Sequence, residues 1–177
     1  NALKPEEIPI RITGSEKCNT CHSLKALGNQ QKSWDESAHS KAYNTLLSDK
    51  AKIFNKEKGL ETPEQNKLCI RCHTTKGILI TTDADVTYNV AEGVGCEACH
   101  GAGSDYSPAE IMKEEELFIK HGGVVGNEET CLKCHSQNAW NKSEQISESV
   151  CPFQDKDFNY KTSFEKIKHP LNKENIK

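Results

Sequence analysis

One short motif, Cys-x-x-Cys-His, occurs four times in this 177-residue chain and limits what the chain can fold into. The chain has nine Cys, and eight of them fall in these motifs. Successive motifs begin 51, 27 and 35 residues apart, so they do not mark a regular solenoid repeat. The motif residues are Cys18, Cys21 and His22; Cys69, Cys72 and His73; Cys96, Cys99 and His100; and Cys131, Cys134 and His135.

The spacing within each motif has a chemical meaning. Two thiols three positions apart can reach the two vinyl groups of one haem, and the adjacent His then meets the iron, so each motif predicts a c-type haem attachment site. The main alternative is zinc, because two Cys-x-x-Cys pairs can form a tetrahedral site. Zinc does not require His after every second Cys, and neither do redox-active pairs or structural disulfides. We therefore expect four covalently bound haem c groups.

The composition is typical of a chain that folds around cofactors. Only 34% of the residues are hydrophobic, and the mean hydropathy is -0.74, which is poor material for an ordinary core. Four macrocycles would supply the missing apolar interior. The length predicts a single domain, residues 1–177, in which residues 1–14 form an extended strap. The predicted fold class is mostly α with long loops and one small β-hairpin, a multihaem cytochrome c built around four covalent haems.

Periodicity and capping signals predict where the regular structure lies. Apolar spacing and end signals predict helices over residues 33 to about 59, 107–121 and 162–169. Two β-rich pieces, residues 78–82 and 86–90, predict a hairpin with its turn at residues 83–85.

The number of histidines limits how the irons can be ligated. The chain has seven His; four belong to the motifs, which leaves His39, His121 and His169, one on each predicted helix. Four haems with two His each would need eight, and an assembly of identical copies keeps the same ratio. At least one haem therefore lacks a second His. Met112, Cys151, a lysine or water could take that position, or it could stay open, which is the interpretation that we favour.

Charge and hydropathy exclude two classes of protein. The net charge is -3, from 23 basic and 26 acidic residues spread along the chain, which argues against a nucleic-acid-binding protein. No apolar run approaches the ~20 residues that a membrane span needs. Because haem c is attached outside the bacterial cytoplasm, we expect a periplasmic or extracellular protein whose signal peptide has already been removed.

Three stretches carry a further similarity: residues 34–42 (WDESAHSKA), residues 93–101 (GVGCEACHG), and Pro152 and Phe153 followed by Tyr160, Phe164 and His169. In these stretches the chain resembles the cytochrome c-554 family, tetrahaem proteins that receive electrons from hydroxylamine oxidation. The resemblance implies parallel stacked haem pairs joined by a more perpendicular contact. It also implies that His39 binds the third haem, His121 the fourth and His169 the first, and that the haem of His73 is five-coordinate.

A weaker resemblance concerns the order of the motifs. Tetrahaem subunits of extracellular filaments share it, and there a His of one subunit can complete a haem in the next. This resemblance implies a homo-oligomer, with His121 and His169 as the candidates for donation.

Electron transfer between redox partners through closely packed haems is the function that we predict. Haem propionates would bring the net charge to about -7, so the partner is expected to dock through a basic surface, and added salt is expected to slow docking. One alternative is an enzyme that reduces nitric oxide or a similar small nitrogen species at the five-coordinate haem, although no motif supplies a proton donor for it. The other alternative is a subunit of an electron-conducting filament.

Overall fold

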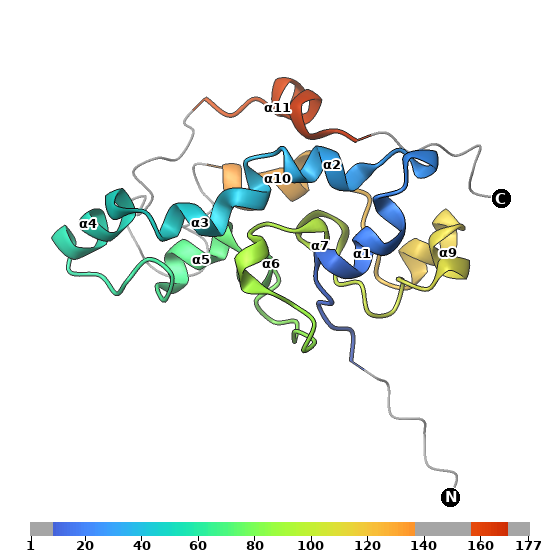
Figure 1. The fold of residues 1–177 in the computed structure, drawn as a ribbon, viewed down its shortest axis with the longest axis horizontal. Helices are drawn as coiled ribbons and strands as arrows, with labels where there is room; N and C mark the ends of the chain where they lie inside the picture. Colours follow the sequence, from blue (N-terminus) through green and yellow to red (C-terminus); the bar gives the residue numbers. More distant parts are fainter. Residues whose placement is uncertain (1–8, 137–156, 170–177) are drawn as a thin grey trace, which may run out of the picture.

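The computed structural model describes residues 9–136 and 157–169 as a succession of short helices joined by loops (Figure 1). The α-helices and 3-10 helices (η) are α1 (Ser15–His22), η1 (Lys25–Leu27), α2 (Gln30–Asp35), η2 (His39–Lys41), α3 (Ala42–Leu46), α4 (Asp49–Glu57), α5 (Lys67–His73), α6 (Thr75–Ile78), η3 (Val90–Glu92), α7 (Cys96–His100), α8 (Ala109–Met112), α9 (Glu115–Lys120), α10 (Glu128–His135) and α11 (Tyr160–Ile167). The mostly helical class expected from the sequence is confirmed.

The helices form an elongated body with α4 at one end and α9 at the other (Figure 1). Each Cys-x-x-Cys-His motif ends its own short helix: α1, α5, α7 and α10. Helix α7 lies near the middle of the body, and α11 runs along one side of it (Figure 1). Within the two described ranges, no helix combines the length and the apolar character that crossing a membrane requires.

The N-terminal strap enters the body at Ile12, whose side chain is fully buried. The Ile12 amide donates to the Asp83 carbonyl at 2.8 Å, and the Asp85 amide donates to the Ile12 carbonyl at 2.7 Å. These two bonds form an isolated parallel bridge between Ile12 and Ala84. The strap therefore pairs with a loop more than seventy residues further along the chain.

The predicted hairpin over residues 78–90 is wrong. Residues 75–78 form α6, because the Thr74 side chain accepts a hydrogen bond from the Gly77 amide and caps the helix. Residues 79–89 are turns and loop, and η3 begins at Val90. The segment that was expected to pair with itself instead pairs with Ile12, so tertiary pairing overrides the local β propensity.

The single helix predicted over residues 33–59 is also wrong, since the structure divides it into four pieces, α2, η2, α3 and α4. The Ser40 hydroxyl donates to the carbonyls of Asp35 and Ser37, each at 3.0 Å, and so uses groups that a continuous helix would bond. A new helix then starts at Ser48, whose side chain accepts from the Ala51 amide at 3.3 Å. Small hydroxyl side chains thus interrupt an otherwise helical apolar pattern.

The other two predicted helices exist with different limits. The helix expected over residues 107–121 is divided into α8 and α9, which are separated by Lys113 and Glu114. Helix α11 starts at Tyr160 rather than at residue 162, because Asn159 is its N-cap and accepts from the Thr162 amide at 3.1 Å. In both regions the expected type of structure is present and its boundaries move by a few residues.

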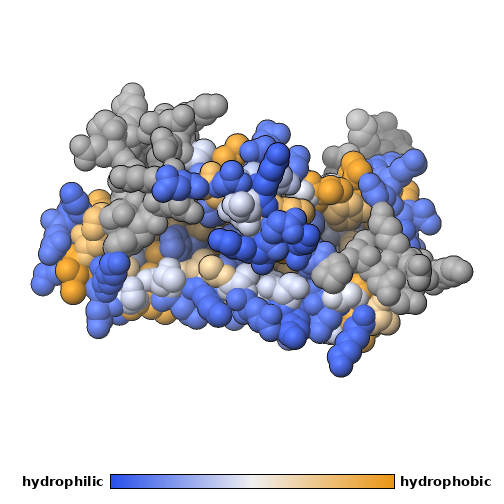
Figure 2. Space-filling view, turned by 90° about the horizontal axis from the view of Figure 1, so that it is seen from above, coloured by the Kyte–Doolittle hydropathy of each residue, from blue (hydrophilic) through white to orange (hydrophobic). Residues whose placement is uncertain are grey.

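The apolar core of the described residues is small. Its buried hydrophobic side chains are Ile12, Leu46, Val94, Ala98, Ala102 and Tyr106. Larger apolar side chains remain exposed at both ends of the body, such as Ile53 on α4 and Ile119 on α9. Figure 2 shows hydrophobic residues gathered toward these two ends of a largely hydrophilic face. Side-chain packing alone gives this chain little apolar interior.

Candidate functional site

The eight motif cysteines are free thiols, and none of them forms a disulfide. They are therefore chemically available for covalent attachment to vinyl groups. The ninth cysteine, Cys151, lies outside the described residues, so the structure gives no information about its expected role.

Thiols of different motifs lie beside one another. A hydrogen bond links Cys18 of the first motif to Cys96 of the third; it raises the pKa of Cys18 and lowers that of Cys96. A second hydrogen bond links Cys72 of the second motif to Cys134 of the fourth and lowers the pKa of Cys72. The structure therefore pairs the first motif with the third and the second with the fourth.

The two pairs meet at the third and fourth motifs. Burial, followed by the nearby Cys131 thiol, raises the pKa of Cys99 to about 11. Cys99 in turn contributes to the raised pKa of Cys134. The motifs are therefore arranged in the spatial order first, third, fourth, second.

Three motif histidines share one type of orientation. In each, the ring Nδ1 atom lies within hydrogen-bond distance of an acceptor oxygen in the protein. The pairs are His22 with Gln30 Oε1 at 3.1 Å, His73 with the Ala42 carbonyl at 2.8 Å, and His100 with the Val124 carbonyl at 3.0 Å. A proton on Nδ1 satisfies these contacts and leaves Nε2 as the free lone pair, as is typical of metal-binding His. The donor set thus fits a haem iron.

The Nδ1 partners were not identified from the sequence. Gln30 is buried, and its amide nitrogen donates to the Leu27 carbonyl at 2.6 Å, which turns Oε1 toward His22. The other two partners are backbone carbonyls, and no residue type marks such a position. Gln30 is a polar residue at the start of the helix that follows the first motif, and this position was the one sign in the sequence of a partner for His22.

His39 lies beside the histidine of the fourth motif. Its ring centroid is 6.1 Å from that of His135, and the Phe158 ring stacks on His135 with a centroid distance of 4.6 Å. Two imidazoles on opposite faces of one metal ion have centroids ~6 Å apart, since each metal–nitrogen bond is ~2 Å. Burial, and then His135, lower the pKa of His39, which keeps its imidazole in the neutral form that binds metals.

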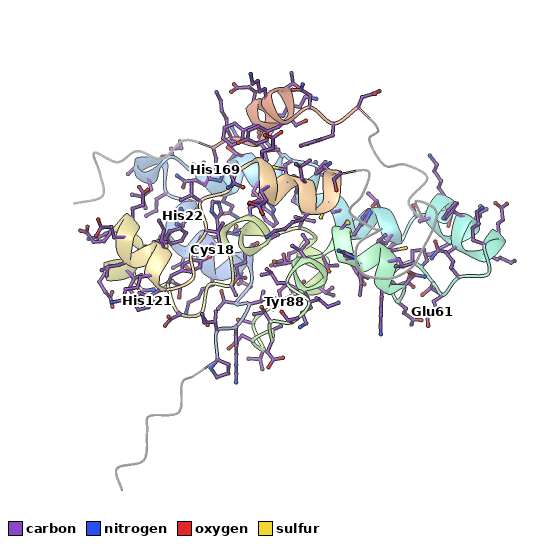
Figure 3. The ribbon with its side chains drawn as sticks, turned by 180° about the vertical axis from the view of Figure 1, so that it is seen from behind. Cys18, His22, Glu61, Tyr88, His121 and His169 are labelled. Atoms are coloured by element: carbon purple, nitrogen blue, oxygen red, sulfur yellow. The ribbon has the colours of Figure 1, made fainter. Side chains whose placement is uncertain are left out.

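His169 lies beside the histidine of the third motif. The ring centroids of His169 and His100 are 5.9 Å apart. Burial lowers the pKa of both rings, and each also interacts unfavourably with a second neighbour, His22. Figure 3 shows His169 close to His22, with Cys18 beyond. The structure thus brings His169 to the third motif and near the first.

These neighbours differ from the pairing that the family resemblance implied. That pairing assigned His39 to the third motif and His169 to the first, whereas the structure places their rings beside His135 and His100. Pairings of this kind depend on how distant segments pack.

His121 follows α9, toward one end of the body and apart from His169 (Figure 3). Its Nδ1 atom lies 2.8 Å from Asp105 Oδ2, and its side chain is 32% exposed. Helix α9 is joined to the first motif through Tyr106, whose ring contacts Phe118 at a centroid distance of 4.8 Å. Cys18 also acts on Tyr106, whose pKa is raised mainly by burial. Cys96 also acts on Tyr106, and the Val124 amide donates to the His100 carbonyl at 2.8 Å, so His121 lies in a segment that borders both the first and the third motif.

A buried carboxylate holds the third motif in place. Glu97 lies between the two cysteines of this motif and is 1% exposed. It accepts hydrogen bonds from the backbone amides of Thr13 at 2.8 Å, Gly14 at 2.7 Å and Gly103 at 2.6 Å. Glu97 thereby ties α7 to the strap and to the loop that follows the motif. Only its position between two cysteines could have indicated this role.

The segment before the third motif also positions His39. The Val94 amide donates to the His39 carbonyl at 3.0 Å, and the Trp34 indole donates to the Val94 carbonyl at 2.9 Å. Gly93 has φ +77°, and a Cβ atom there would lie 2.6 Å from the His39 carbonyl oxygen. A glycine is therefore required where these two segments meet.

We expect Gly93→Ala to lower the free energy of unfolding by ~3 kcal/mol, because it combines a backbone conformation strained for alanine with a clash against the His39 carbonyl. Gly59→Ala is the matched control, since Gly59 also has positive φ but open space around its Cβ position; its expected cost is ~1 kcal/mol. Denaturant unfolding followed by circular dichroism measures both. If both substitutions lowered the free energy of unfolding equally, the close approach of Gly93 to the His39 carbonyl would not contribute to stability.

A small cavity lies beside the second and fourth motifs. Its volume is about 120 Å³, and its lining residues are Arg71, Ile78, Lys133 and Cys134. Arg71 and Lys133 each directly precede the second cysteine of their motif. The two cations give this cavity a positive wall suited to carboxylate groups, such as haem propionates.

Comparisons with known proteins agree with the chemistry of these motifs. A family model described as cytochrome c554 and c-prime matches residues 17–101, which include the first three motifs. Cytochrome c-554 from Nitrosomonas europaea is 28% identical over 142 residues, which cover 69% of this chain and 56% of the relative. The chain thus spans little more than half the length of that curated relative. No solved structure matches the chain.

Proposed function

We propose that this chain is a tetrahaem cytochrome of the cytochrome c-554 family, which its family-model match and its curated relative support, and that it carries electrons between redox proteins. The family assignment makes the chain a c-type cytochrome that binds haem covalently and takes part in electron transfer. The observation that carries the finer proposal is the proximity of thiols from neighbouring motifs, in the order first, third, fourth, second. Such crowding suits conduction through the protein better than chemistry at one site.

The chain's own residues would hold each haem by two thioethers and one axial imidazole. Each bound haem supplies an iron that accepts and returns one electron. The protein's part is to orient the axial ring. The Nδ1 contacts of His22, His73 and His100 prevent the rings from rotating and raise the basicity of Nε2.

The ring contacts support a second histidine ligand for each of two haems. His39 would complete the haem of the fourth motif and His169 that of the third, because their centroid distances to His135 and His100 suit two imidazoles on one iron. Ligation by two histidines keeps the coordination unchanged between oxidation states and favours fast electron transfer.

His121 would serve the first motif. In support, Phe118 of its helix packs against Tyr106, on which Cys18 acts, and Asp105 lies within hydrogen-bond distance of its Nδ1 atom, as backbone carbonyls do for His73 and His100. The haem of His73 then has no histidine left and would be five-coordinate. Met112, Cys151 and lysine remain as alternative sixth ligands at that haem.

The electron path would follow the spatial order of the motifs. Contacts between thiols lead from the first motif through the third and fourth to the second. The two ends of this path are the natural entry and exit points. One of them is the haem expected to have an open coordination site, so a small ligand would bind at an end of the path.

The setting of the protein is also a proposal. Attachment of haem c outside the cytoplasm favours the periplasm as the location, with an extracellular position as the alternative. The negative net charge favours a redox partner with a basic surface. The matches favour neither the nitric oxide reductase nor the filament subunit, so electron transfer is the function that we propose.

Haem content and low-temperature electron paramagnetic resonance (EPR) test the tetrahaem proposal. Mass spectrometry of the mature protein is expected to give the chain mass plus four haem groups. The oxidised protein is expected to show three low-spin signals and one high-spin signal, and only the high-spin signal should respond to nitric oxide. A mass with fewer haems would contradict the tetrahaem proposal, and four low-spin signals would contradict the open site.

A further inference from the structure

A second carboxylate near the third motif has no role in the electron path described above. Glu92 ends η3, and its Oε2 accepts from the Ser15 amide at 2.8 Å, while its Oε1 accepts from the Thr75 hydroxyl at 3.3 Å. Ser15 begins the helix of the first motif, and Thr75 lies two residues after the second motif. Glu92 therefore links the start of the first motif's helix to the residues that follow the second motif.

The Glu92 side chain occupies space beside the third motif that is free only because residue 95 is glycine. A Cβ atom at Gly95 would collide with Glu92 Oε1 and with the Ser15 hydroxyl. The Gly95 amide donates to the Thr75 hydroxyl at 2.8 Å, which aligns that hydroxyl with Glu92. The absence of a side chain at Gly95 thus lets the carboxylate approach the motif.

Glu92 differs from Glu97 in its access to solvent. Glu97 is 1% exposed and accepts hydrogen bonds from three backbone amides. Glu92 is only half-buried. Among the described residues no lysine, arginine or histidine forms an ion pair with it. The Glu92 carboxylate can therefore exchange a proton with water.

The charge of Glu92 affects the pKa values of two cysteines that are expected to attach haem, Cys18 and Cys96. It contributes to the raised pKa of Cys18 and opposes the lowering of the pKa of Cys96. Burial, and to a lesser extent the Glu97 charge, raise the pKa of Glu92 itself, against the lowering effect of the Ser15 amide. A carboxyl group in this position has a proton affinity that responds to nearby charge.

We propose that Glu92 takes up a proton when the haem of the first or third motif is reduced, so that the protein couples proton transfer to electron transfer. This rests on the proposed function. One electron comes from a reduced one-electron donor protein and one proton from water; the electron stays on the haem iron and the proton converts the Glu92 carboxylate to a carboxylic acid. Oxidation by the acceptor protein reverses both. The coupling is reciprocal, so the proton raises the haem potential as much as the electron raises the proton affinity.

The groups that face Glu92 do not offer another proton acceptor. They are Glu97 on α7, Tyr88, and the thiols of Cys18 and Cys96. Burial raises the pKa of Tyr88 above its ordinary value near 10, so it stays neutral. The thiols become thioethers when haem is attached and then no longer titrate.

Potentiometric titration of the holoprotein between pH 5 and pH 9 tests the coupling. In the wild type at least one midpoint potential is expected to fall with pH, with a slope approaching ~59 mV per unit for one proton per electron, the one-electron equivalent of a tenfold change. In Glu92→Gln that slope is expected to be lost. Glu57→Gln, an exposed acid at the end of α4, is the control and should keep the wild-type slope.

A second measurement does not depend on the variant folding. Reduction of the wild type in weak buffer is expected to take up close to one proton, and infrared difference spectra should show a new protonated carboxyl band that Glu92→Gln lacks. Potentials independent of pH in the wild type, or an unchanged slope in Glu92→Gln, would overturn the proposal. Failure of the tetrahaem proposal would appear separately, as a lower haem content by mass spectrometry.

Discussion

Glu97→Ala is expected to lower the free energy of unfolding by about 3 to 5 kcal/mol. The carboxylate is 1% exposed and accepts from three backbone amides. Each buried amide left without an acceptor costs ~1–3 kcal/mol, and partial access of water reduces the sum. The variant would also release the strap from α7, so we expect a lower yield of protein with a haem on the third motif. Denaturant unfolding and mass spectrometry measure the two effects.

Two controls separate the buried carboxylate from a general loss of charge. Glu97→Gln keeps one acceptor oxygen but turns an amide group toward donors, so its expected cost is roughly half that of alanine. Glu36→Ala removes a carboxylate that is 69% exposed and paired with Lys32 at 3.8 Å, and it should cost less than 1 kcal/mol by the usual value of exposed pairs. If Glu97→Ala cost no more than Glu36→Ala, Glu97 would not anchor the strap.

His39→Ala is expected to convert one low-spin haem to high spin. The 6.1 Å separation of the His39 and His135 rings assigns the lost ligand to the fourth haem. EPR should show a second high-spin signal, and the corresponding midpoint potential should rise, because an imidazole that stabilises the oxidised iron is lost. Added imidazole should restore the low-spin signal. Lys41→Ala, an exposed residue of the same 3-10 helix, is the control and should keep the wild-type spectrum.

A variant without the fourth haem decides between the two assignments of His39. In Cys131→Ala/Cys134→Ala, adding His39→Ala should create no further high-spin signal if His39 serves the fourth haem. If His39 serves the third haem, as the family resemblance implies, one more high-spin signal would appear. That result would contradict the pairing seen in the structure.

Sequence reasoning was most accurate where the chemistry is local. The four motifs and the resemblance in residues 93–101 led to the family that the comparisons support. It failed where distant segments compete for the same groups. Ile12 pairs with the loop around Ala84, so no hairpin forms there, and the Ser40 hydroxyl interrupts the expected long helix.

The Glu92 and Glu97 carboxylates show a different limit. In the sequence they are two acids among 26 acidic residues, and nothing in their spacing separates them from solvated ones. Their roles depend on amides of residues 13–15, which lie about eighty positions earlier. Which acidic residues are buried is therefore known only once the packing of residues 13–15 against residues 92–97 is known.

The sequence by itself determined the class of cofactor and the number of histidines. Covalent haem attachment needs only a pentapeptide, and the deficit of one histidine for the four proposed haems is a matter of counting. The tertiary structure alone decided which motifs lie side by side, which histidine lies beside which, and which carboxylates are buried. Those properties arise from packing between segments far apart in the chain, and no local pattern of residues encodes the distance between them.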